Sequence, residues 1–253
     1  MATLNRNGVT LHYVDTGSGS PIFLTHGFGA SSRMWQRQID AFSDRYRVIA
    51  WDMRGHGETD SPTDLAMYSE PETVADMNAI LDASGVDKAV IGGLSLGGYM
   101  SLAFNLVHPE RTRALMLFDT GPGFNNPQGR KGWNQFAIRR AEAFETDGLA
   151  ALGGSPEVKA AGHRSAEGLA KAARGMLTQR DASVIQSLTS INKPTLVVTG
   201  ADDRNFLAAH SYMSETIPGA MHFMIDNAGH SANIDQPEAF NVAVEKFLKT
   251  LPS

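Results

Sequence analysis

The sequence predicts an α/β fold in which helices cover both faces of a mainly parallel sheet, with an all-helical lid insertion. Short apolar runs alternate with helical patterns through the first half of the chain and again near its end. Most of these runs are apolar throughout, which is typical of parallel strands buried on both faces. Between the two alternating regions, residues 122–192 contain helical patterns and no convincing strand.

The first alternating region predicts five strands and three helices. The strands are expected at 10–15, 21–25, 46–51, 89–91 and 114–118. The helices are expected at 31–42, at 71–84 and from about 96 to 108. Ser31 is a candidate N-cap for the first helix, Pro71 suits the first turn of the second, and Pro109 ends the third.

The second half of the chain begins with helices and then returns to strands. Helices are expected at 131–147, 156–162, 165–178 and 181–188. A strand at 194–199, a helix at 207–217, a strand at 221–225 and a helix at 237–250 follow. We therefore expect a core of residues 1–121 and 193–253 and a helical lid of residues 122–192. Because ligand sites of parallel sheets form at the carboxyl ends of strands, a lid leaving from such an end should cover the site.

Composition and charge narrow the function classes. The chain has 253 residues, 42% of them hydrophobic, which is enough for a substantial core. A net charge of −5 argues against nucleic-acid binding. The predicted lid is locally basic, with nine Lys and Arg against six Asp and Glu. Solvated helix faces are the favoured explanation for this excess, and attraction of anionic substrates is the alternative.

Several residue types and segments are missing from the sequence. It contains no cysteine, which excludes disulfides, thiolate metal sites and cysteine catalysis. No signal peptide is visible at its start, and no apolar run approaches the ~18 residues needed to span a bilayer. We expect a cytoplasmic protein without cofactor or metal and without a membrane or nucleic-acid partner. The sequence does not indicate the oligomeric state.

The segment Gly93-Leu94-Ser95-Leu96-Gly97 has the pattern G-x-S-x-G between an apolar run and a helical pattern. In that setting a serine lies on a sharp strand-to-helix turn, the nucleophile elbow. Glycines are needed because side chains on either side of so tight a turn would collide with the strand and the helix. Ser95 is therefore the candidate nucleophile. The N–H of Leu96 opens the following helix and can face a developing oxyanion.

Two loops after earlier strands are rich in glycine. An N–H of the loop His26-Gly27-Phe28-Gly29, that of Phe28 in our interpretation, could pair with the Leu96 N–H to form an oxyanion hole. We interpret His26 itself as a structural residue of the turn. The loop at 52–57 is also interpreted as structural, with Asp52 and Arg54 available to pair.

A serine nucleophile needs a general base and a residue that orients the base. Of the eight histidines, His230 is best placed, because it lies in a loop that follows the predicted strand 221–225. The orienting acid should follow the preceding strand, where Asp202 and Asp203 are adjacent. Asp119, at the end of another strand, is a third candidate. The chain order is therefore nucleophile, acid, base.

With these motifs the chain resembles the α/β-hydrolase superfamily over essentially its whole length. The resemblance implies an eight-stranded sheet and the backbone N–H groups of Phe28 and Leu96 as oxyanion donors. In relatives with G-x-x-D in the acid loop the aspartate is catalytic, which implies Asp203 rather than Asp202. Many relatives have a proline four residues beyond this acid, whereas Leu207 stands here.

The elbow suggests a branch of the superfamily. A serine nucleophile argues against the haloalkane dehalogenases and epoxide hydrolases, which attack with aspartate. The elbow is similar to those of small esterases and enol-lactonases, and Leu94 counts against the carbon–carbon hydrolases, which more often have asparagine there. We predict a serine hydrolase of a small carboxylic ester or lactone. The alternatives are a carbon–carbon hydrolase of a vinylogous keto acid and a ligand-sensing, non-enzymatic member of the superfamily.

Overall fold

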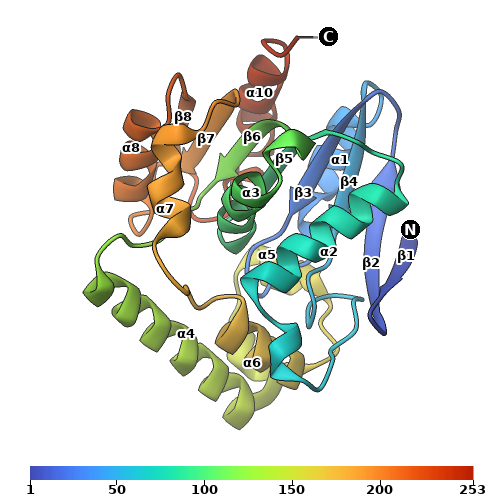
Figure 1. Ribbon diagram of the computed structural model, residues 1–253, viewed down its shortest axis with the longest axis vertical. Helices are drawn as coiled ribbons and strands as arrows, with labels where there is room; N and C mark the ends of the chain where they lie inside the picture. The colour runs from blue at the N-terminus through green and yellow to red at the C-terminus, as the bar shows by residue number, and fades with distance from the viewer. Residues whose placement is uncertain (253) are drawn as a thin grey trace.

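The computed structural model describes residues 1–252, which contain one eight-stranded sheet in the order β1-β2-β4-β3-β5-β6-β7-β8 (Figure 1). The pairs β1–β2 and β2–β4 are antiparallel, and all other pairs are parallel. The predicted α/β fold is confirmed. The strands are β1 (Ala2–Arg6), β2 (Val9–Thr16), β3 (Ser20–Thr25), β4 (Tyr46–Trp51), β5 (Ala89–Leu94), β6 (Thr112–Phe118), β7 (Thr195–Gly200) and β8 (Met221–Ile225).

Helices cover both faces of this sheet and fill the long connection from β6 to β7. The α-helices are α1 (Gln36–Phe42), α2 (Glu70–Ala83), α3 (Leu96–Val107), α4 (Pro127–Asp147), α5 (Pro156–Ala161), α6 (Ala166–Gly175), α7 (Ser183–Ser187), α8 (Leu207–Thr216), α9 (Ala232–Asp235) and α10 (Pro237–Leu248). The short 3₁₀ helices are η1 (Ser32–Trp35), η2 (Leu65–Met67), η3 (Pro109–Arg111), η4 (Gly148–Leu152) and η5 (Leu188–Ser190). Within residues 1–252, no helix is both long enough and apolar enough to cross a membrane.

The structure differs from the sequence prediction at the ends of several elements. The edge strand β1 was not predicted; its residues alternate between half-buried and exposed, and only Ala2 and Leu4 pack against the core. Ser31 precedes the 3₁₀ helix η1 rather than an α-helix, and its side chain makes no capping hydrogen bond. Helix α4 begins at Pro127, four residues earlier than predicted, because the Asn126 side chain caps it by accepting from the Gly129 N–H at 2.6 Å.

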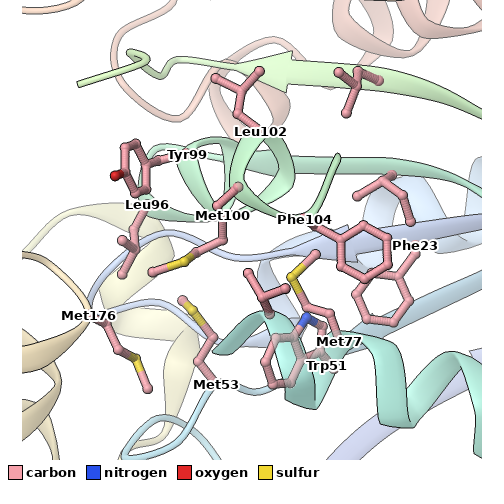
Figure 2. Close-up of a cluster of buried hydrophobic side chains, with 14 of the residues drawn as sticks. Phe23, Trp51, Met53, Met77, Leu96, Tyr99, Met100, Leu102, Phe104 and Met176 are labelled. Carbon is pink, nitrogen blue, oxygen red and sulfur yellow. The ribbon is translucent and has the colours of Figure 1, made fainter. Parts of the chain in front are cut away.

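Each face of the sheet has its own apolar core. On one face, α2 and α3 pack Met77, Met100 and Phe104 against Phe23 and Trp51 of the sheet (Figure 2). On the other face, α1 and α10 cover the sheet in the same way. Ten of the twelve residues of α3 are buried. Each fully buried large apolar side chain contributes about 1.5–3 kcal/mol relative to exposure, so this helix and the residue that precedes it are held in place.

The connection from β6 to β7 contains α4 to α7, and we call residues 122–192 the helical segment. Helices α4 and α6 lie side by side at one end of the molecule (Figure 1). Their small apolar cluster includes Phe144 and Leu169 and also contacts Phe28, in the loop after β3. A Cβ added to Gly55, in the loop after β4, would lie 2.5 Å from the backbone oxygen of Gly168. The helical segment therefore rests on the loops at the carboxyl ends of β3 and β4.

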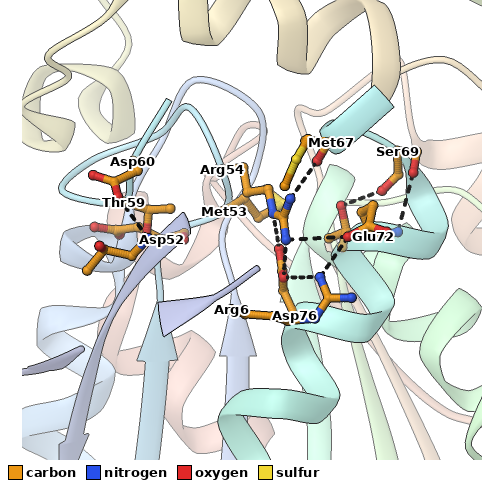
Figure 3. Close-up of polar contacts among 12 residues, drawn as sticks. Arg6, Asp52, Met53, Arg54, Thr59, Asp60, Met67, Ser69, Glu72 and Asp76 are labelled. Carbon is orange, nitrogen blue, oxygen red and sulfur yellow. Dashed lines mark hydrogen bonds and ion pairs between the residues drawn. The ribbon is translucent and has the colours of Figure 1, made fainter. Parts of the chain in front are cut away.

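A buried ion-pair network fixes the loop after β4 to helix α2 (Figure 3). Arg54 donates to both carboxylate oxygens of Asp76 at 2.6 and 2.7 Å, and both side chains are fully buried. Arg6 adds a hydrogen bond of 2.8 Å to the same carboxylate. The pairing suggested between Asp52 and Arg54 was therefore wrong. Asp52 instead accepts from the backbone N–H groups of Ser32 and Glu58, at 2.6 and 2.9 Å.

Removing the carboxylate of this network should be costly. We expect Asp76→Asn to lower the free energy of unfolding by about 3–5 kcal/mol, because the buried Arg54 guanidinium loses its bidentate partner and keeps only the partly exposed Glu72, 3.4 Å away. Urea denaturation measures the change. As a control, Glu238→Gln removes the exposed partner of Arg37, 3.8 Å away, and should change stability by less than about 1 kcal/mol. A similarly small effect of Asp76→Asn would contradict the prediction.

Candidate active site

Ser95 lies on a strained turn between β5 and α3. Its φ and ψ are 55° and −116°, a conformation that non-glycine residues rarely adopt. Its N–H donates to the Phe118 carbonyl at 2.9 Å, and its own carbonyl accepts from the Thr120 hydroxyl at 2.6 Å. Bonds to the neighbouring strand β6 therefore hold this backbone in place, as expected of an elbow that presents a nucleophile.

The glycines around Ser95 allow α3 to touch the end of β3. A Cβ on Gly97 would lie 2.2 Å from the Thr25 carbonyl oxygen and 2.6 Å from that of His26, which no real side chain could tolerate. On the opposite side, a Cβ on Gly27 would lie 3.3 Å from the Ser95 Cβ. The loop after β3 therefore lies directly beside the serine.

The loop beside Ser95 forms a tight turn. The Ala30 N–H donates to the Gly27 carbonyl at 3.1 Å, and Gly29 has a φ of 76°, which favours glycine. In residues 1–252 no protein acceptor takes the Phe28 N–H. The Leu96 N–H stands at the first position of α3, where a helix offers it no acceptor. Both of the predicted oxyanion donors are thus free to bind a ligand atom.

Asp203 and His230 meet across the loops that follow β7 and β8. The Nδ1 atom of His230 lies 2.7 Å from Oδ2 of Asp203. The aspartate side chain is 4% exposed and the imidazole 38% exposed, so one is enclosed while the other remains accessible. Asp202, the adjacent acid, is exposed. The Phe206 ring stacks on the imidazole with centroids 4.8 Å apart.

Carboxylates set the charge state of His230. Burial lowers the pKa of this imidazole, but the hydrogen bond and charge of Asp203, together with the charges of Asp119 and Glu157, raise it above its ordinary value overall. Such an environment stabilises an imidazolium, the species that forms when a histidine accepts a proton from a nucleophile.

Asp119, the third candidate acid, connects two loops instead of contacting the imidazole. It is fully buried and accepts from the Gly200 N–H at 2.8 Å and from the Ala232 N–H at 3.2 Å. Burial raises its pKa to about 7, although the Gly200 hydrogen bond and the nearby His230 act in the opposite direction. The end of β7, before Asp203, is thereby tied to the start of α9, after His230.

Three residues next to the site were not singled out by the sequence analysis. Phe206 and Glu157 act on His230 as described, and His163 of the helical segment contacts the turn beside Ser95. Only the spacing of Phe206, three residues after Asp203, could have drawn attention in the sequence. His26 donates to the Gly27 carbonyl and accepts from the Met53 N–H, consistent with its predicted structural role. Residues 1–252 contain no cluster of three or more His, Asp or Glu suited to a metal.

Comparisons with known proteins identify similar sequences over nearly the whole chain. The sequence profile of a family described as "alpha/beta hydrolase fold" matches residues 20–237. A 3-oxoadipate enol-lactonase of Acinetobacter baylyi is 30% identical over 98% of this chain and 96% of its own. A putative 2-succinyl-6-hydroxy-2,4-cyclohexadiene-1-carboxylate synthase of Bacillus subtilis is 28% identical over 99% of this chain and all of its own.

An esterase and an enol-lactonase are among the solved structures that resemble this chain. A thermophilic esterase from Thermogutta terrifontis superimposes with a TM-score of 0.86 and 28% identity over 99% of this chain and 97% of that chain. The enol-lactonase from Burkholderia xenovorans LB400 has a TM-score of 0.84 and 25% identity over 98% of this chain and 100% of that chain.

The Asp119 carboxylate can be tested through its effect on His230. Because Asp119, once it ionises around its raised pKa of about 7, stabilises the imidazolium, we expect Asp119→Asn to lower the pKa of His230 in an NMR pH titration of the imidazole. Asp202→Asn, at the exposed neighbouring acid, serves as control and should have a smaller effect. An unchanged His230 titration in Asp119→Asn would show that the two groups do not interact.

Proposed function

The chain belongs to the alpha/beta hydrolase fold family, and within this family of hydrolases we propose that it is a serine hydrolase of a small carboxylic ester or lactone. One observation carries the proposal. The strained Ser95 and the 2.7 Å pair of His230 and Asp203 follow strands β5, β7 and β8, whose carboxyl ends share one edge of the sheet. The esterase and enol-lactonase among the similar structures support this choice of substrate.

The proposed reaction proceeds through an acyl-enzyme. Ser95 Oγ attacks the substrate carbonyl carbon while Nε2 of His230 takes its proton. The N–H groups of Phe28 and Leu96 stabilise the oxyanion, and each such donor is worth about 2.7–4 kcal/mol in the transition state. His230 then protonates the leaving alcohol oxygen as the carbon–oxygen bond breaks. A water, deprotonated by His230, attacks the acyl carbonyl carbon, and His230 returns the proton to Ser95 Oγ as the acyl–oxygen bond breaks.

We also propose that the helical segment is the lid of a core formed by residues 1–121 and 193–253. Three contacts support this assignment. The Phe144 ring of α4 lies 6.0 Å from that of Phe28, and a Cβ on Gly29 would lie 3.6 Å from Leu152 and 3.7 Å from Val158. Apolar side chains of the helical segment therefore cover part of the turn beside Ser95, which suits an uncharged acyl group.

Charges near the site argue against the rival substrate class, the vinylogous keto acids, which are anionic. The charges that act on His230 come from three carboxylates: Asp203, Asp119 and Glu157. Three of the lid's cations are already paired with carboxylates, since Arg164 binds Glu58, Lys171 binds Glu167 and Arg174 binds Glu145. The charges that act on His230 are therefore negative, which disfavours an anionic substrate beside it.

The nucleophile is tested by Ser95→Ala. We expect this variant to lose activity on p-nitrophenyl acetate by about 10³-fold or more while its thermal unfolding remains cooperative, and to lose labelling by a fluorophosphonate probe. Ser190→Ala, at an exposed serine, should keep both properties. Full activity in Ser95→Ala would overturn the proposal. If the wild type binds a ligand but neither hydrolyses an ester nor reacts with the probe, the result would favour the alternative of a ligand-sensing, non-enzymatic protein.

The charge preference is tested with two esters of equal length, p-nitrophenyl hexanoate and mono-p-nitrophenyl adipate. We expect the wild type to prefer the neutral ester. Glu157→Gln should raise kcat/KM for the adipate ester about threefold to tenfold and change that for the hexanoate less than about twofold, because one screened repulsion is removed. Glu142→Gln, at an exposed carboxylate of α4, should leave the ratio unchanged. An unchanged ratio in Glu157→Gln would rule out a role for this charge.

A further inference from the structure

Two imidazoles hold the carbonyl groups of the turn at residues 27–30. His26, at the end of β3, donates from Nδ1 to the Gly27 carbonyl at 2.7 Å. His163, from the helical segment, donates from Nε2 to the Gly29 carbonyl at 2.8 Å. These carbonyls lie on either side of Phe28, whose N–H remains free. The orientation of that N–H therefore depends on both imidazoles.

Each imidazole also ties the turn to the loop after β4. The Met53 N–H donates to Nε2 of His26 at 3.0 Å, and the Gly57 N–H donates to Nδ1 of His163 at 3.1 Å. Each ring thus uses one nitrogen as a donor and the other as an acceptor, an arrangement that only the neutral form with one defined tautomer can satisfy.

The buried ring of His56 fills the space between these groups. Its centroid lies 5.0 Å from that of His26, 5.6 Å from that of His163 and 5.5 Å from that of Phe28. The loop that carries it is held by Asp52, whose carboxylate accepts from the Glu58 N–H at 2.9 Å. A displacement of His163 would therefore change the packing around Phe28.

We propose that His163 is a positioning residue that couples the seating of the helical segment to the geometry of the oxyanion hole. The inference rests on the proposed function, since it assumes that the Phe28 N–H binds the oxyanion. With His163 in place, both carbonyls of the turn are held and the donor is preorganised. When the helical segment lifts, the Gly29 carbonyl loses its partner and the turn is held on one side only.

Protonation of His163 breaks its hydrogen bond to the loop after β4, whereas the Nε2–H can still donate to the Gly29 carbonyl. An imidazolium has no lone pair on Nδ1, so it cannot accept from the Gly57 N–H. Burial lowers the pKa of His163, against the opposing effects of the Gly29 hydrogen bond and the Asp52 charge, so the ring is neutral at neutral pH and becomes charged only on acidification. The titratable and charged groups around it are His26, Arg33, Asp52, His56, Glu58 and Arg164.

Two substitutions separate the hydrogen bond from the titration. His163→Leu removes both hydrogen bonds, whereas His163→Gln keeps an N–H donor for the Gly29 carbonyl and does not titrate. Arg164→Gln is the matched control, because Arg164 ties the same segment to Glu58 without touching the turn.

Kinetics on p-nitrophenyl acetate test the coupling. We expect His163→Leu to lower kcat about tenfold to hundredfold with KM within about twofold, because an oxyanion donor acts mainly in the transition state. His163→Gln should retain most of kcat. On the acid side, log kcat/KM of the wild type should fall with a slope near 1 from His230 and become steeper where His163 is also protonated and the turn loses its tie to Gly57, whereas His163→Gln should keep a slope near 1. Arg164→Gln should match the wild type.

Hydrogen–deuterium exchange of the peptide containing residues 27–30 supplies a readout that needs no activity. We expect faster exchange in His163→Leu than in the wild type at neutral pH, with His163→Gln close to the wild type. A kcat within about twofold of the wild type in His163→Leu, or the same loss in Arg164→Gln, would overturn the inference. If the wild type hydrolyses no ester, the proposed function fails, and unchanged exchange in His163→Leu would then overturn the coupling independently.

Discussion

The close approach of helix α3 to the end of strand β3 is the constraint on which the rest of the site depends. Gly97 meets the carbonyl groups of Thr25 and His26 at distances that exclude any side chain. This contact forces Ser95 into its strained conformation and brings the turn at residues 27–30 beside it. Because ten residues of α3 are buried, core packing stabilises the strain that the turn alone could not maintain.

Hydrogen bonds between side chains and backbone groups hold the remaining loops around this contact. Asp119 accepts from N–H groups at the end of β7 and at the start of α9, and so links the loops of Asp203 and His230. His26 and His163 likewise link the turn to the loop after β4. Buried groups that bridge loops are well suited to this purpose, because an unpaired buried polar group would cost about 1–3 kcal/mol.

The surroundings of His230 and those of the Phe28 turn differ in charge. Carboxylates from the strand ends and from α5 surround His230 and favour its protonated form, whereas burial keeps His26, His56 and His163 neutral beside the Phe28 turn. The first environment suits an imidazole that accepts a proton from Ser95. The second leaves the backbone N–H groups as the principal positive groups facing a developing oxyanion. An uncharged substrate is compatible with both.

The sequence by itself determined where strands β2 to β8 lie along the chain, within three residues at each end, and the turn that carries Ser95. Both follow from local patterns, since apolar runs and glycine spacing act over a few residues. Only the tertiary structure decided that Asp203 contacts His230 while Asp119 ties two loops, that Arg54 pairs with Asp76, and that His163 reaches Gly29. These contacts join residues that are distant in the sequence, and the direction of each side chain depends on packing that no local pattern contains.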